Sequence, residues 1–90
     1  MPVLRLSHPL SFGKQEVAEL KFRDYTTAAD YLSFDKRGGV AQRIALIASV
    51  AGVDEALVLQ LHGKDYLAAE AVVNALLAYD EAPEGDLEKK

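Results

Sequence analysis

The hydrophobic pattern of this chain changes its period near residue 25, and this change constrains the fold more than any other feature. Up to Arg23, apolar and polar residues alternate, as they do in a strand pair with one buried face. Over residues 26–79, apolar residues recur every three or four positions, which is typical of helices. The sequence therefore predicts an α+β fold, with an N-terminal β-hairpin followed by a bundle of about four short helices.

The predicted hairpin covers residues 3–23, with Gly13 in the turn, where glycine tolerates a positive φ. A lone hairpin is only marginally stable in water, so its apolar face needs cover, and the helices can supply it. That face is assigned to alternate residues of both strands: Leu4, Leu6, His8, Leu10, Ala18, Leu20 and Phe22.

The first two helices are predicted from their end signals. Thr26 or Thr27 can cap the first helix, because threonine side chains accept hydrogen bonds from the first turn. The second runs from about Val40 to Ala51 and ends at Gly52, a residue suited to a left-handed C-cap. The apolar anchors of the first helix are predicted to be Tyr31, Leu32 and Phe34, and residues 35–39 are predicted to be a loop.

The third helix is predicted to begin at Asp54 and to end at Gly63, and the last to run from about Asp65 to Tyr79. The last helix has few polar residues on any side, so it must be buried on most sides. A chain of 90 residues buries only roughly 60–65% of the surface that its unfolded form exposes. The apolar surplus is the one feature with functional weight, and two interpretations of it stay open: a compact core, or a face for an apolar helical partner or for self-association.

Residues 1–79 are expected to form a single domain, and residues 80–90, rich in charge with Pro83 and Gly85, a disordered polar tail. No stretch approaches the roughly 20 apolar residues that span a bilayer, and no signal peptide is visible, so the cytoplasm is the expected location. With a net charge of −4 and a pI near 5.0, the chain lacks the basic face of a nucleic-acid binder.

No constellation of reactive side chains predicts catalysis, and no cofactor is expected. The two histidines, His8 and His62, have no thiolate to help them hold a metal, and His62 is placed at the end of the third helix. Residues 36–39 precede a helix and could hold an anion, but a flexible turn is the favoured interpretation. Three aspartates are interpreted as helix caps and solvated surface carboxylates: Asp24, Asp30 and Asp35.

The order of these features resembles the small tail assembly chaperones of Mu-like contractile-tailed phages. The resemblance lies in the first strand with its proline and Phe-Gly turn (residues 4–13), the second strand (16–23) and the Thr-Ala-Ala-Asp helix start (26–30). It continues through the apolar helix with its Gly-Val turn (44–55) and the final apolar helix (61–77), and covers about residues 3–79. The pair Thr26-Thr27 stands where such proteins often have a proline.

The resemblance implies that the chain binds the tape-measure protein, a very long and largely helical chain. It would keep that protein soluble until the tail tube polymerises around it, would act in the host cytoplasm and would be absent from the mature virion. It also implies homo-oligomers, and as further partners a tail-tube subunit or a frameshifted longer isoform, with no nucleic acid and no membrane. The apolar excess of the second and fourth helices places the protein-binding face on six residues: Ile44, Ile47, Val50, Val72, Leu76 and Leu77.

Two other interpretations stay open at this point. A small oligomeric scaffold or adaptor would use the same helices for self-association and would leave an apolar helical peptide unbound. A nucleic-acid-binding regulator could be built from a hairpin and short helices, although the acidic charge and the lack of a basic helix count against it.

Overall fold

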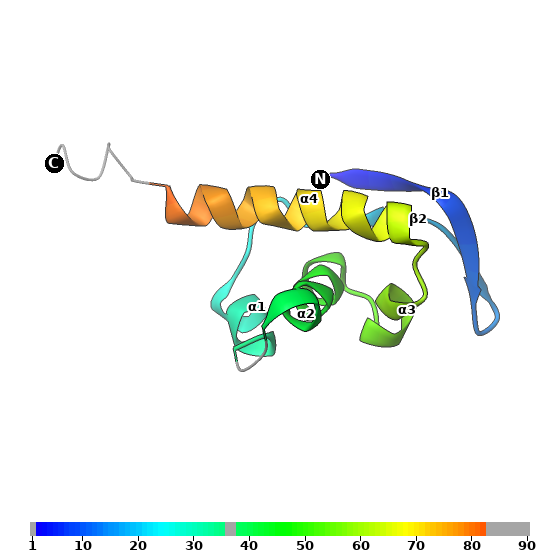
Figure 1. Cartoon of the computed structure of the whole chain (residues 1–90), viewed down its shortest axis with the longest axis horizontal. Helices are drawn as coiled ribbons and strands as arrows, with labels where there is room; N and C mark the ends of the chain where they lie inside the picture. Colours follow the sequence, from blue (N-terminus) through cyan, green and yellow to red (C-terminus); the bar gives the residue numbers. More distant parts are fainter. Residues whose placement is uncertain (1, 36–37, 83–90) are drawn as a thin grey trace, which may run out of the picture.

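A hairpin and four helices form the fold, as the change of period predicted. The structure is a computed structural model that describes residues 2–35 and 38–82. The strands and helices follow one another in this order: β1 (Val3–Phe12), β2 (Gln15–Lys21), α1 (Ala28–Ser33), α2 (Gly39–Ala51), α3 (Glu55–Leu59) and α4 (Gly63–Glu81). Helix α4 lies along one side of α1, α2 and α3, and the hairpin curves around the N-terminal end of α4 (Figure 1).

The register of the antiparallel hairpin shifts in the middle of β1. Arg5 pairs with Glu19, but the next aligned pair is Leu10 with Val17, so residues 6–9 of β1 lie opposite Ala18 alone. Proline has no N–H for a ladder, which makes Pro9 a natural place for the interruption. β1 bends where the ladder is broken (Figure 1).

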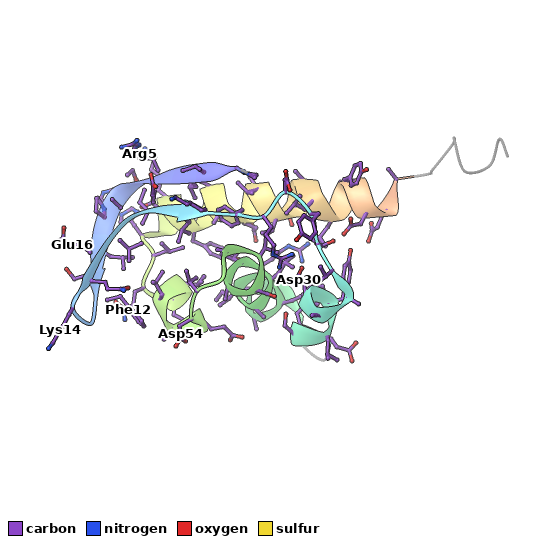
Figure 2. All side chains as sticks on the ribbon, turned by 180° about the vertical axis from the view of Figure 1, so that it is seen from behind. Arg5, Phe12, Lys14, Glu16, Asp30 and Asp54 are labelled. Carbon is purple, nitrogen blue, oxygen red and sulfur yellow. The ribbon has the colours of Figure 1, made fainter. Side chains whose placement is uncertain are left out.

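The register shift changes which residues of the hairpin face the helices. Val17 packs against the core, and Ala18 is exposed, so the assignment of Ala18 to the buried face is wrong. His8 is exposed as well, because it lies in the interrupted part of β1. Near the turn, Phe12 packs against the core from the inner side of the curved hairpin (Figure 2).

The core lies between the hairpin and the helices and is contributed by every element of the fold. Leu20 of β2, Phe22 just after it, Leu46 and Ile47 of α2, and Val73 of α4 are all buried, so β2, α2 and α4 share one interior. The other buried apolar residues are Leu6, Phe34, Ala45, Ala48, Val50, Leu57, Val58, Leu61 and Ala69. Within the first helix the predicted anchors divide: Phe34 is buried and Tyr31 half-buried, but Leu32 is 74% exposed, so its assignment as an anchor is wrong.

Most helix ends follow the predicted signals. Thr27 caps α1 and forms a capping box with Asp30, and Gly52 ends α2 in the left-handed region at φ 68°. The Asp54 side chain accepts a hydrogen bond from the Ala56 amide at the start of α3. The predicted end of the third helix at Gly63 is wrong, because α3 ends at Leu59 and Gly63 is the first residue of α4.

Helix α4 is longer than predicted at both ends, and it continues through Asp80 and Glu81, the first residues of the predicted polar tail. Residues 83–90 of that predicted tail lie outside the described residues. His62 is the N-cap of α4, not the end of α3: its Nδ1 accepts the Lys64 amide at 3.1 Å. The predicted placement of His62 at the end of the third helix is therefore wrong.

Candidate functional site

A buried carboxylate fixes the hairpin to α4. Asp65, 3% exposed in the first turn of α4, accepts hydrogen bonds from the Ser7 amide at 2.8 Å, the Ser7 hydroxyl at 2.8 Å and the His8 amide at 3.0 Å. These amides belong to the part of β1 that has no regular ladder with β2. Beside them the His8 and His62 rings stack with centroids 3.8 Å apart. The interrupted strand is therefore completed by a helix side chain.

The same contacts set the ionisation of Asp65. Burial raises the pKa of this carboxyl, but hydrogen bonds from the Ser7 amide and hydroxyl and the His8 amide lower it, and the net pKa lies below the ordinary value. Asp65 is therefore a charged acceptor at neutral pH, and its oxygens are occupied by the hairpin.

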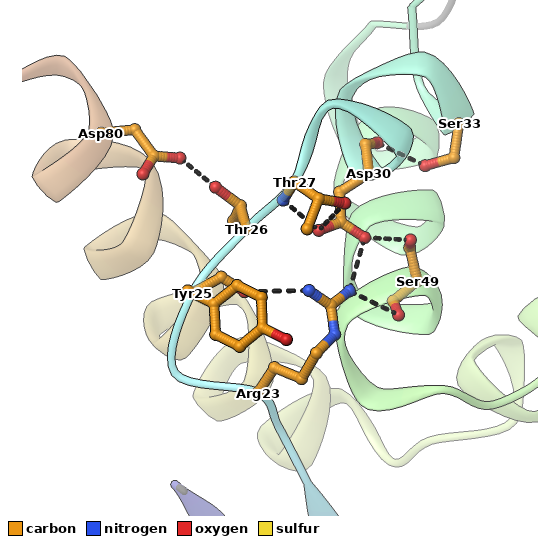
Figure 3. A network of polar contacts seen from close by, with 8 residues as sticks. All are labelled: Arg23, Tyr25, Thr26, Thr27, Asp30, Ser33, Ser49 and Asp80. Atoms are coloured by element: carbon orange, nitrogen blue, oxygen red, sulfur yellow. Dashed lines mark hydrogen bonds and ion pairs between the residues drawn. The ribbon is translucent and has the colours of Figure 1, made fainter.

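A second buried carboxylate joins β2, α1 and α2 (Figure 3). Asp30, 1% exposed, forms an ion pair with Arg23 at 2.7 Å, accepts the Ser49 hydroxyl and accepts the Thr27 amide at 2.7 Å. Arg23 also donates to the carbonyl oxygen of Tyr25 at 3.0 Å, and its guanidinium lies over the Tyr25 ring. The interpretation of Asp30 as a solvated surface carboxylate is wrong, although its capping role is confirmed.

Asp30 is held in its charged form by this network. Burial raises the pKa of the carboxyl, and the hydrogen bonds from Arg23, Ser49 and Thr27 together lower it below its ordinary value. The other two aspartates of this region, Asp24 and Asp35, are exposed. The three carboxylates therefore do not converge on one site.

The far end of α4 is attached to the same region. Asp80 accepts the Tyr31 hydroxyl at 2.6 Å and also the Thr26 hydroxyl (Figure 3). With Asp65 at one end and Asp80 at the other, α4 is fixed along its length to the hairpin and to α1. These polar clusters position helices, and among the described residues no buried side-chain nitrogen or oxygen lacks a hydrogen-bond partner.

The six residues predicted to bind a partner divide between the core and the partly exposed surface. Ile47 and Val50 are buried in the core, at 0% and 2% exposure. The other four are partly exposed and pack against the core from its edge: Ile44 on α2, and Val72, Leu76 and Leu77 on α4. One of the four, Ile44, lines an apolar cavity.

That cavity is part of a groove between α2, α3 and the N-terminal half of α4, which we call the α2–α4 groove. Its apolar end, about 190 Å³, is lined by Val40, Ile44, Val58, Leu59, Leu61, Gly63 and Tyr66. Its polar end, about 430 Å³, is lined by Gly39, Val40, Gln42, Arg43, Glu70 and Asn74. Val40 lines both cavities, so the two adjoin at this side chain.

The apolar end exposes large side chains that a monomer usually buries. Val40 is 59% exposed and Leu59 is 67% exposed, above a base of buried Val58 and Leu61. Exposed apolar groups gathered around a concave surface mark binding sites for other proteins. The α2–α4 groove is therefore the candidate functional site of the described residues.

Leu59 and Tyr66 were not among the predicted binding residues. Leu57 and Val58 of α3 and Leu61 just after it account for the buried face, which leaves Leu59 as the leucine that this face does not explain. The sequence therefore contained a signal for Leu59, because it is an apolar residue that the buried face does not require. Tyr66 gave no such signal, because its place in the groove depends on where α4 begins.

Nowhere in residues 2–35 and 38–82 do three or more histidine, aspartate or glutamate side chains gather around a position that suits a metal ion. Over the same residues, no helix combines the length and the apolar character needed to cross a bilayer.

Comparison with known proteins identifies a family. The chain matches the family described as "Phage tail assembly chaperone proteins, E, or 41 or 14" over residues 3–78, which is most of its length and includes the hairpin, α1, α2, α3 and all but the last three residues of α4. No curated protein and no solved structure shows a significant match. The family is one of assembly chaperones, which act by binding tail proteins, in agreement with the expected partner class. The chain belongs to the phage tail assembly chaperone family.

Proposed function

We propose that this chaperone binds the tape-measure protein of its phage and keeps it soluble until the tail tube polymerises around it. The observation that carries the proposal is the α2–α4 groove, where Val40 and Leu59 remain exposed in a chain of an assembly-chaperone family. A long helical chain with an apolar stripe would aggregate in water, and burying that stripe against a groove gains about 25 cal/mol per Å² of apolar surface.

The proposed binding face comprises the exposed groove residues Val40 and Leu59, together with the partly exposed residues of the set predicted on α2 and α4. Ile44, Val72, Leu76 and Leu77 are partly accessible to a partner. Ile47 and Val50 are buried beneath them and contribute by holding the face in shape. The partly exposed residues thus replace the full predicted set as the contact surface that we propose.

Each contact of this kind is small, so binding of one copy is weak and reversible. Many copies along one tape-measure chain, or a homo-oligomer of the chaperone, would supply the avidity that a single groove lacks. Weak individual contacts also allow tail-tube subunits to displace the chaperone. On this proposal the protein acts in the host cytoplasm and leaves before the virion is complete.

Co-expression with the tape-measure protein of the same phage tests the proposal. We expect the tape-measure protein to be largely insoluble alone and soluble with the chaperone, and the two proteins to elute together in size-exclusion chromatography. A chain with Phe22→Asp is the matched control. Phe22 is fully buried, so a charge there prevents folding while the rest of the composition is retained.

A tape-measure protein that stays insoluble beside an abundant and folded chaperone would contradict the proposal. Equal rescue by the Phe22→Asp chain would also contradict it, because the folded surface would then be unnecessary. Formation of chaperone oligomers without any bound tape-measure protein would instead support the scaffold interpretation.

A further inference from the structure

The two ends of the α2–α4 groove differ in chemistry, and this difference defines the kind of helix that fits. The apolar end offers Val40, Ile44 and Leu59 to a side chain that has no polar atoms. The polar end places Arg43 beside Gln42 on the same depression. A ligand that fills both ends must carry an apolar group and a polar group at a fixed separation from each other.

Arg43 is the residue of this surface whose side chain can select a charged group on a partner. Its Nε donates to the Asn74 side-chain oxygen at 2.5 Å, and its NH1 donates to the Gln42 side-chain oxygen at 3.0 Å. Both acceptors are neutral amides, so these bonds orient the guanidinium without compensating its charge. A guanidinium has five N–H donors in a planar fork that matches a carboxylate, and these two bonds leave part of the fork available.

The carboxylate that lines the same end of the groove is already engaged. Glu70 accepts the Tyr66 hydroxyl at 3.0 Å. This hydrogen bond and burial raise the pKa of Tyr66, so the hydroxyl remains a donor to Glu70. Glu70 is therefore held by Tyr66, and among the described residues no ion pair joins it to Arg43, so the Arg43 guanidinium can take a carboxylate from a partner.

The spacing of the two ends follows from α2. Val40 and Arg43 are three residues apart, and Val40 and Ile44 are four apart, so the apolar end and the guanidinium are neighbours within one helical turn of about 5.4 Å. A helix lying along the groove would present matching groups at the same separation. Its apolar anchor and its charged residue would be three or four positions apart.

We infer that the α2–α4 groove binds an amphipathic helix that inserts a leucine-like side chain among Val40, Ile44 and Leu59 and sets a carboxylate, three or four residues away, against Arg43. The inference rests on the proposed function in that the helix belongs to the tape-measure protein. It adds a sequence rule for the bound segments: an apolar anchor paired with Asp or Glu at helical spacing. The groove thus recognises a subset of the apolar segments in its partner.

The first experiment locates the surface. Synthetic 20-residue peptides that tile the tape-measure protein are immobilised, and binding of the purified full chain is measured. The change Leu59→Gln keeps the size and net charge of the chain, and we expect it to weaken binding about tenfold, as loss of an anchor in a pocket does. Leu67→Gln is the matched control, because Leu67 is 62% exposed on α4 and does not line the groove. Its binding should stay within about twofold of wild type, the range of peripheral contacts.

The second experiment tests the charge rule. Peptides bound by the wild-type chain should be enriched in Asp or Glu three or four positions from an apolar residue. With Arg43→Glu the preference should change to Lys or Arg at that position, while the apolar requirement persists. Bound peptides with no charge preference, or with a basic preference in the wild type, would overturn the role of Arg43. Far-UV circular dichroism of each variant should match that of the wild type.

The outcomes separate this inference from the proposed function. If Leu59→Gln binds like wild type, or Leu67→Gln is the weaker variant, while the tape-measure protein remains soluble, the groove is the wrong surface and the proposed function stands. If no peptide binds the wild-type chain and the tape-measure protein is insoluble beside it, both fail together.

Discussion

Replacing Asp65 by asparagine should remove most of the connection between the hairpin and α4. Asparagine can accept the Ser7 bonds with its one oxygen, but its NH₂ group would face the His8 amide, which now donates at 3.0 Å. Hydrogen bonds to a charged group contribute about 1.5–3 kcal/mol each, and an unmatched buried donor costs about 1–3 kcal/mol. Because part of the Ser7 interaction survives, we expect Asp65→Asn to lower the free energy of unfolding by about 2–3 kcal/mol.

Urea and thermal unfolding of the full chain measure this loss. For a domain of this size each kcal/mol corresponds to about 4–8 °C, so the Tm should fall by about 10–20 °C. Asp54→Asn is the matched control: Asp54 is an exposed N-cap, and asparagine caps a helix as well as aspartate, so we expect a change below about 0.5 kcal/mol.

The pH dependence of the loss provides a second check. The pKa of Asp65 is lower in the folded chain than the ordinary value of an aspartate, so the unfolded chain binds more protons near that ordinary pKa. The Asp65 contribution is therefore fully present above the unfolded pKa and disappears as the pH falls through the folded pKa. The stability difference between wild type and Asp65→Asn should shrink below about pH 4. Equal stability of the two chains at pH 7, or a difference that grows toward acid, would refute the role assigned to Asp65.

Two paired substitutions test the backbone and the core by urea denaturation. Gly52→Ala should destabilise the chain by about 1–2 kcal/mol, because φ is 68° there, whereas Gly63→Ala should be neutral or stabilising by up to about 1 kcal/mol, because its φ is not in the left-handed region and open space surrounds it. Equal effects at both glycines would contradict the C-cap argument. Phe22→Ala should cost about 3–5 kcal/mol, since Phe22 is fully buried, and Leu32→Ala, at a 74% exposed site, should stay within about 0.5 kcal/mol. A small loss at Phe22 would show that the hairpin is not part of the core.

Local signals in the sequence predicted the elements of the fold and most of their ends. The capping threonine, the left-handed glycine after α2 and the aspartate before α3 each act on backbone groups within four residues of themselves. Such interactions are readable from a single segment, because the partner of each group is nearby in the chain. The period of the hydrophobic pattern supplied the strand and helix types in the same way.

Contacts between segments that are distant in the sequence could not be predicted from these local signals. Whether Val17 or Ala18 faces the core depends on the register shift in β1, and that part of β1 is completed by Asp65, 58 residues from Ser7. The buried state of Asp30 depends likewise on Arg23 and Ser49 from other elements. Alternation within a strand cannot indicate that another element takes over its hydrogen bonds.

The sequence predicted two of the helices that form the candidate site, but few of the residues that line it. The apolar excess of the second and fourth helices pointed to a partner surface, and Ile44 lies in the groove. Ile47 and Val50 are buried in the core, whereas Leu59 of α3 is exposed, and composition could not distinguish between these two cases. That distinction requires the packing of α3 against α2, which the apolar pattern of neither helix encodes.

The long separation between Ser7 and Asp65 has a consequence for the order of folding during synthesis. The hairpin leaves the ribosome first, yet the carboxylate that completes β1 is joined to the chain only after 57 intervening residues. Helices α1, α2 and α3 can form from local contacts while the hairpin still lacks its contact with α4, since local contacts form faster than distant ones. Closing the loop to α4 is then the late step, and it carries the largest entropy cost. Before α4 appears, the N-terminal strand of this chaperone is thus itself an unprotected strand edge. Other proteins avoid this condition by covering their edges early.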